Sequence, residues 1–136
     1  MRPPRSLRQE QAALLLRKAG QDEVLLDAVL DLPQVYDETI GYHVQQAAEK
    51  LLKAALAAHG VVYRRTHNLD ELILLLQRNE VVFPDDLLPI RAFTTFAVEP
   101  RYEDLPPEEI TLDRPAARDD LYRLRAWAEA QVENAV

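Results

Sequence analysis

Four polar side chains recur at helical spacing within residues 37–60, and their types suit contact with an anionic ligand. We call these four the polar stripe: His43, Gln46, Lys50 and Lys53. Steps of three and four residues place them on one flank of a helix. Their ammonium, imidazole and amide groups can donate hydrogen bonds to phosphate oxygens. Glu49 lies beside the stripe and can pair with Lys53 at i,i+4. The stretch therefore predicts a candidate binding site.

Four further residues are candidates for the same site. Asp22 falls inside the apolar face of a predicted helix, where a carboxylate needs a partner. It is bonded either to a neighbouring helix or turn, or within a site. His67 precedes a predicted helix, and its imidazole either fixes the loop or reaches toward another helix. Arg101 carries a planar fork of donors that suits a phosphate, although it can equally pair with Asp22 or Glu49. Tyr102, the residue after Arg101, is the fourth of these further candidates.

Several other kinds of chemistry are excluded by what the sequence lacks. It has no cysteine, so disulfides, thiolate metal sites and cysteine nucleophiles are absent. Its three glycines form neither a GxxxxGK[ST] nor a GxGxxG loop. The histidines at 43, 59 and 67 lack the HxxxH or HExxH spacing of a zinc site. Ser6 is the single serine, which argues against a Ser-His-Asp triad. We therefore expect no metal and no cofactor.

The bulk composition describes an ordinary soluble domain. The chain has 136 residues, 48% hydrophobic and 29% charged, so we expect one domain over 1–136. The net charge of −7 disfavours indiscriminate binding to a nucleic-acid backbone. No apolar run approaches the roughly 20 residues of a membrane span, and the N-terminus lacks the apolar centre of a signal peptide. These features predict a cytoplasmic protein that does not contact a membrane.

Helical periodicity accounts for most of the chain. We expect helices over 7–32 and 37–60, a third from Leu69, a fourth after Pro84 that stops before Pro100, and a fifth from Asp113. Ser6, Asp37 or Thr39, and Asn68 are the predicted caps of the first three. Residues 1–5 should be loose, and 99–113 should form an acidic, proline-rich loop. The predicted fold is all-α, an up-and-down bundle of about five helices with two long antiparallel N-terminal helices as its core.

Three segments in this order resemble the HEPN domain family. They are HVQQAAEKLLKAAL at 43–56, RTHNLDELI at 65–73 and EPRYED at 99–104, preceded by Ala19 and Asp22 in the first helix. The resemblance implies a small all-α bundle, a homodimer and suspected nucleotide binding. It also suggests metal-independent RNase activity, which in many members uses an Arg and a following His with four to six residues between them. None of the three histidines here lies five to seven positions after an arginine, so that motif is missing.

Three readings of function remain after this departure from the family pattern. The preferred one is a homodimeric module that performs no chemistry alone. It would bind a nucleotide or, as in toxin-antitoxin-like two-component systems, a minimal nucleotidyltransferase. In that setting the Tyr102 hydroxyl could accept a nucleotide, or the side chain could be buried for structural reasons. The second reading is a divergent RNase that uses His43 or His67 with Lys50 and Arg101 on an RNA ligand. In the third, the polar stripe only stabilises the fold.

Overall fold

The computed structural model describes residues 4–98 and 104–135, and within these ranges every regular element is a helix. In order, the elements are α1 (Arg5–Val29), α2 (Asp37–Ala58), α3 (Leu69–Arg78), the 3-10 helix η1 (Asp85–Thr94), α4 (Thr95–Val98), the 3-10 helix η3 (Pro107–Glu109) and α5 (Arg114–Asn134). No described helix is long and apolar enough to cross a bilayer. The predicted all-α bundle is confirmed.

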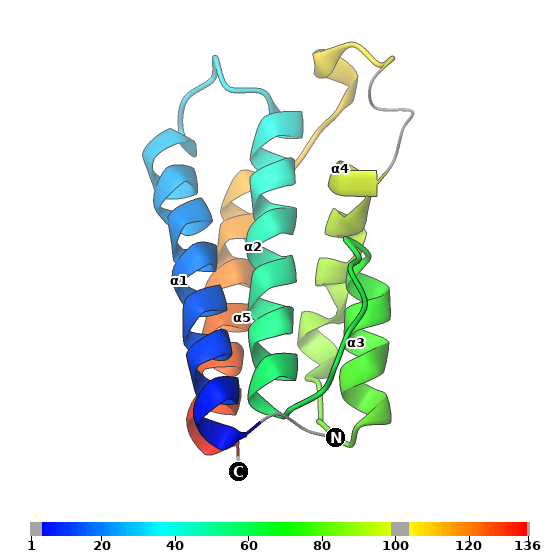
Figure 1. Ribbon diagram of the computed structural model, residues 1–136. Helices are drawn as coiled ribbons and strands as arrows, with labels where there is room; N and C mark the ends of the chain where they lie inside the picture. The colour runs from blue at the N-terminus through cyan, green and yellow to red at the C-terminus, as the bar shows by residue number, and fades with distance from the viewer. Residues whose placement is uncertain (1–3, 99–103, 136) are drawn as a thin grey trace.

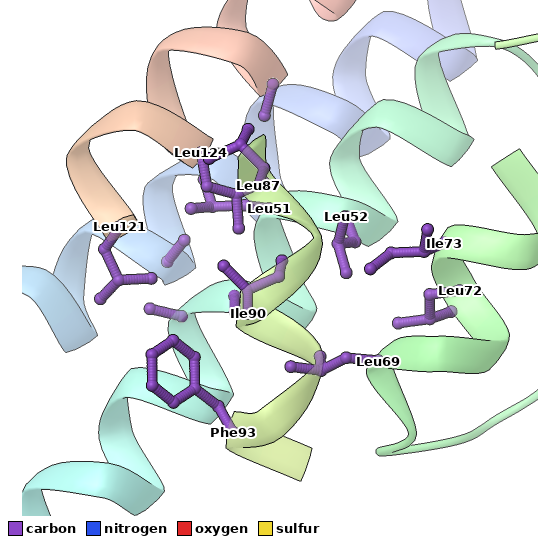
Figure 2. Packing of buried hydrophobic residues seen from close by; sticks show 14 of the residues in the cluster. Leu51, Leu52, Leu69, Leu72, Ile73, Leu87, Ile90, Phe93, Leu121 and Leu124 are labelled. Atoms are coloured by element: carbon purple, nitrogen blue, oxygen red, sulfur yellow. The ribbon is translucent and has the colours of Figure 1, made fainter. Parts of the chain in front are cut away.

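Helix α2 lies at the centre of the bundle. It runs antiparallel to α1, with α5 beside both, and packs against α1, α3, α4, α5 and η1. The segment between α2 and α3 runs back beside part of α2 before α3 begins, so that α3 runs parallel to α2 (Figure 1). Figure 2 shows where the core forms: leucine, isoleucine and phenylalanine side chains from α2, α3, η1 and α5 converge between the helices. The polar stripe therefore belongs to the helix that also organises the core.

Helix ends follow the sequence where a cap could be identified from local spacing. The Asn68 side chain accepts a hydrogen bond from the Glu71 backbone N–H at 3.2 Å, and that of Asp113 accepts one from the Ala116 N–H at 3.1 Å. Gly60 has a φ of 71°, the left-handed conformation that commonly follows a helix. These features confirm the predicted start of α3, the start of α5 and the end of α2.

Two predicted caps are wrong. Pro4, not Ser6, occupies the N-cap position of α1, and Tyr36 occupies that of α2, in both cases without a side-chain cap bond. Asp37 instead accepts hydrogen bonds from the Arg114 Nε at 2.6 Å and from the Leu112 N–H at 3.0 Å. A contact with a residue 77 positions away cannot be found by local capping rules. The first helix also ends at Val29, before the predicted Leu32.

The predicted fourth helix exists as two pieces with different geometry. Residues 85–94 form η1, a 3-10 helix with Pro89 inside it, and only α4 has α-helical geometry. Proline has no N–H to donate and its ring clashes with the carbonyl four residues earlier, which disfavours an α-helix. Helix α4 then packs against α2 at Gly41, where an added Cβ would lie 2.4 Å from the Phe96 ring.

Buried ion pairs join α1 to α5. The Glu23 carboxylate, 5% exposed, accepts hydrogen bonds from Arg118 at 3.3 Å and from the Arg125 Nε at 2.7 Å. Arg118 also donates to both carboxylate oxygens of Asp27, at 2.7 and 3.0 Å, and its hydrogen bond lowers the pKa of Asp27. These contacts fix α1 against α5 on the side of α1 that carries Glu23 and Asp27.

Candidate functional site

The first part of the site joins α1 to α2 through Asp22. Its Oδ1 lies 3.1 Å from the Nδ1 of His43, and its Oδ2 accepts a hydrogen bond from the Lys50 Nζ at 2.6 Å. Asp22 is 9% exposed, so the predicted need for a partner is met twice. His43 and Lys50 lie seven residues apart, two turns of α2, and can therefore reach one carboxylate from either end.

The second part joins α2 to the segment that precedes α3. Glu49 is 6% exposed, and its Oε1 lies 2.7 Å from the Nδ1 of His67. Its Oε2 accepts a hydrogen bond from the Lys53 Nζ at 2.8 Å, which confirms the predicted i,i+4 pair. Burial raises the pKa of Glu49, but hydrogen bonds from Lys53, His67 and Gln45 outweigh it, so the net shift of this pKa is downward. Glu49 is therefore a fixed negative charge at neutral pH.

The two parts repeat one arrangement, in which a buried carboxylate lies between an imidazole and an ammonium group. We call them the Asp22 unit, with His43 and Lys50, and the Glu49 unit, with His67 and Lys53. A carboxylate only accepts hydrogen bonds, so each neutral imidazole carries its proton on Nδ1 and leaves its Nε2 outside the contact. Each lysine has two further N–H donors. Both units thus hold groups that an anionic ligand can contact.

Two glutamines connect the stripe to the core. Gln46 donates to the Oε1 of Gln45 at 2.8 Å, and Gln45 donates to the His67 carbonyl oxygen at 2.8 Å and to Glu49 at 3.2 Å. Gln45 is fully buried. Sequence reasoning selected Gln46 and missed Gln45, although a glutamine among the apolar positions of a buried helix is itself a sign of a required hydrogen-bond partner.

Tyr63 is a second residue that sequence reasoning missed. The Lys53 ammonium lies 5.6 Å from the centroid of its ring, which is a cation–π contact. Burial and the nearby Glu49 carboxylate raise the pKa of Tyr63. Tyr63 therefore forms one wall of the Glu49 unit as a neutral aromatic side chain.

Six of the eight candidate residues fall within these two units or beside them. The structure brings Asp22, His43 and Lys50 together, places Lys53 and His67 on Glu49 instead, and puts Gln46 on Gln45. Arg101 and Tyr102 lie outside the described residues, so their predicted roles remain predictions. Arg64, in the segment between α2 and α3, is paired with Glu71 at 2.5 Å, and its side chain is 71% exposed.

The charges of the two units balance. Two lysines and two carboxylates give a formal charge of zero when both imidazoles are neutral, and the charge rises to +2 when both are protonated. Within the part of the chain that the structure describes, no group of three or more His, Asp or Glu side chains is arranged to hold a metal ion.

Comparison with known proteins identifies the family. No curated protein sequence matches this chain, and neither does any solved structure. The family model of the HEPN domain matches residues 12–133, a range that includes every residue of the Asp22 unit and the Glu49 unit. Since this match covers nearly the whole sequence and the fold is an all-helical bundle, the chain belongs to the HEPN domain family.

Proposed function

We propose that this HEPN protein binds a nucleotide through its phosphates along the polar stripe and performs no chemistry alone. The observation that carries the proposal is the repeated unit of imidazole, buried carboxylate and ammonium. The Lys50 and Lys53 side chains are 25% and 13% exposed, so they are accessible yet held in place. Side chains that are already ordered lose less conformational entropy when a ligand binds.

The test is calorimetric titration with adenosine monophosphate and adenosine triphosphate. Removal of Lys50 alone would leave the Asp22 carboxylate buried and partly unpaired, which by itself destabilises a fold. The double variant Asp22→Asn, Lys50→Met removes both charges and avoids that problem. We expect it to weaken binding at least about tenfold, the effect of losing one charge-assisted hydrogen bond. Arg78→Ala, an exposed change at the end of α3, is the control and should bind like the wild type.

Two outcomes of this titration contradict the proposal. If the wild type gives no heat with either nucleotide while Lys50→Ala lowers the melting temperature, the units only stabilise the bundle. If the double variant binds as tightly as the wild type, the ligand contacts another surface.

The proposal extends to a partner and a cell compartment. The HEPN resemblance and the absence of the Arg-x4-6-His motif favour a binding subunit of a two-component, toxin-antitoxin-like system, with a minimal nucleotidyltransferase as the partner. Co-purification with a small nucleotidyltransferase encoded next to this gene would support that role. Failure of the two purified proteins to associate at micromolar concentration would contradict it. The cysteine-free composition favours a cytoplasmic location. We also propose that residues 1–136 form a single domain.

A homodimer is also part of the proposal. Its support is apolar surface beyond what one bundle buries: Leu14, Val62 and Leu74 are 42%, 78% and 44% exposed. Val62 lies on the rim of two hollows of about 350 and 280 Å³, one toward α1 and α2 and the other toward α3. A second copy would cover these side chains. Light scattering should show a dimer with twice the chain mass of 15.6 kDa. Val62→Glu should convert this dimer to the monomer. Val24→Glu, which introduces the same charge outside both hollows, should leave the dimer intact. A monomeric wild type contradicts this.

A second candidate function is a divergent RNase. It is favoured by the contact between Asp22 and His43, because a carboxylate on Nδ1 orients an imidazole whose Nε2 can then accept a proton from a ribose 2′-hydroxyl. Incubation of the purified protein with mixed RNAs separates the two functions. Cleavage by the wild type that is lost in the His43→Ala, His67→Ala double variant would establish the enzyme. Intact RNA with both proteins supports binding alone.

A further inference from the structure

An apolar hollow lies next to the Asp22 unit. It has a volume of about 190 Å³ and is bounded by the C-terminal half of α1, the connection to α2 and the first two turns of α2. The lining side chains are Leu25, Leu26, Val29, Val35, Thr39, Ile40 and His43. Of these, only Thr39 and His43 carry polar groups. The hollow therefore suits a flat apolar or aromatic group better than an ion.

His43 belongs to both the hollow and the Asp22 unit. Its ring forms part of the hollow's wall, while its Nδ1 lies 3.1 Å from Asp22. Lys50 donates to the other oxygen of the same carboxylate and lies seven residues further along α2, about 10 Å along the helix axis. One side of the bundle thus presents an apolar seat and, beside it, ammonium and imidazole groups.

We propose that this hollow holds the base of a nucleotide whose phosphates contact Lys50 and Lys53. The inference rests on the proposed function and adds to it the position and the orientation of the ligand. The base lies against Leu25 and Val29 with the ribose over His43, and the phosphates extend along the polar stripe toward the Glu49 unit.

The lining of the hollow also predicts how selective the site is. Strong discrimination between bases requires side chains that match their donor and acceptor pattern. Although Thr39 and His43 carry polar groups, the surface that the lining residues present to the hollow is apolar. Adenosine and guanosine monophosphates should therefore bind within about threefold of each other. Burial of roughly 60 Å² of the base corresponds to about a tenfold gain in affinity over ribose 5-phosphate.

Two leucines on α1 provide a matched pair of variants. Leu25 lines this hollow and is 41% exposed, whereas Leu14 lines the hollow beside Val62 and is 42% exposed. Because both side chains are partly outside the core, tryptophan at either position can be accommodated without repacking the bundle. Leu25→Trp fills the hollow next to the Asp22 unit. Leu14→Trp makes the same chemical change on the same helix but away from that hollow.

The experiment is titration of the wild type and both variants with adenosine monophosphate, guanosine monophosphate, ribose 5-phosphate and adenosine. We expect Leu25→Trp to reduce affinity for both nucleotides about tenfold, to the level of ribose 5-phosphate, and Leu14→Trp to leave it unchanged. Circular dichroism and a melting curve establish that each variant is folded.

The outcomes separate this inference from the proposed function. Equal binding of adenosine monophosphate and ribose 5-phosphate, with no effect of Leu25→Trp, overturns the base seat and leaves phosphate binding intact. A loss in Leu14→Trp in place of Leu25→Trp also overturns it, because the base then lies in the other hollow. A third outcome is that adenosine binds as tightly as adenosine monophosphate and that Leu25→Trp abolishes this binding. That result supports a base in the hollow but contradicts the phosphate contacts. Binding of none of the four compounds refutes both.

Discussion

Arg114 should contribute strongly to the stability of the bundle outside the site. It donates from Nε to Asp37 at 2.6 Å, and from its terminal nitrogens to the carbonyl oxygens of Leu30 at 2.9 Å, Leu32 at 3.1 Å and Val35. One guanidinium thereby satisfies the residues that follow α1 and holds the first residue of α2. Its side chain is 17% exposed, so water screens these contacts only partly.

The perturbation is Arg114→Met, which keeps most of the apolar stem and removes every donor. The partly buried ion pair contributes about 1–2 kcal/mol and each of the three carbonyl contacts about 0.5 kcal/mol, since water can reach part of them. The expected loss is about 3 kcal/mol of the free energy of unfolding, or a fall in melting temperature of about 10 °C for a chain of this length. Urea unfolding and calorimetry measure both quantities.

Arg123→Met is the matched control on the same helix. Arg123 also contacts carboxylates, those of Asp86, Asp119 and Asp120, but its side chain is 42% exposed and no backbone carbonyl takes part in these contacts. We expect almost no change in its urea midpoint. If the Arg114→Met protein were as stable as Arg123→Met, the contacts of Arg114 with the carbonyl oxygens would contribute nothing to stability, contrary to this prediction. Arg114→Lys should recover only part of the loss, since an ammonium cannot reach four acceptors at once.

Two further predictions concern α2. Gly41→Ala should lower stability by about 1–3 kcal/mol, because the overlap with the Phe96 ring exceeds the gain of roughly 1 kcal/mol in helix propensity; a raised melting temperature would contradict this. The pKa of Glu49 in the folded protein lies below the ordinary glutamate value of 4.5, so its contribution to stability is complete above that pH and is lost as the pH falls through the folded pKa. Urea midpoints of Glu49→Gln should therefore change less between pH 5 and pH 3 than those of the wild type, and parallel curves would count against the assignment.

The fold could be predicted because its information is local. The 3.6-residue periodicity of α2, the Asn68 cap and the glycine after α2 each lie within one or two turns of what they determine. The polar stripe could be predicted for the same reason, since His43, Gln46, Lys50 and Lys53 share one helix. Asp22 was recognisable as a buried carboxylate from its place among leucines, although its partners were not.

The remainder depends on contacts between segments that are distant in the sequence. Asp37 has the residue type of a cap, yet Arg114 binds it from 77 positions away. Glu49 was predicted to pair with Lys53, but its contact with His67 depends on how the segment after α2 returns along the bundle. Helical periodicity in the sequence gives no information about these contacts.

The central position of α2 has a consequence for how a ligand is received. Its inner faces are locked among five neighbouring elements, so the helix cannot rotate or slide without repacking the leucines of Figure 2. The Asp22 and Glu49 units are consequently held at a constant separation, and a ligand that contacts both must match that distance. Amide hydrogens of α2 should exchange with deuterium only through global unfolding, whether the protein is empty or occupied. Slower exchange on ligand addition is expected instead in the two segments that flank the units, residues 30–36 beside the apolar hollow and residues 61–68, which carry His67.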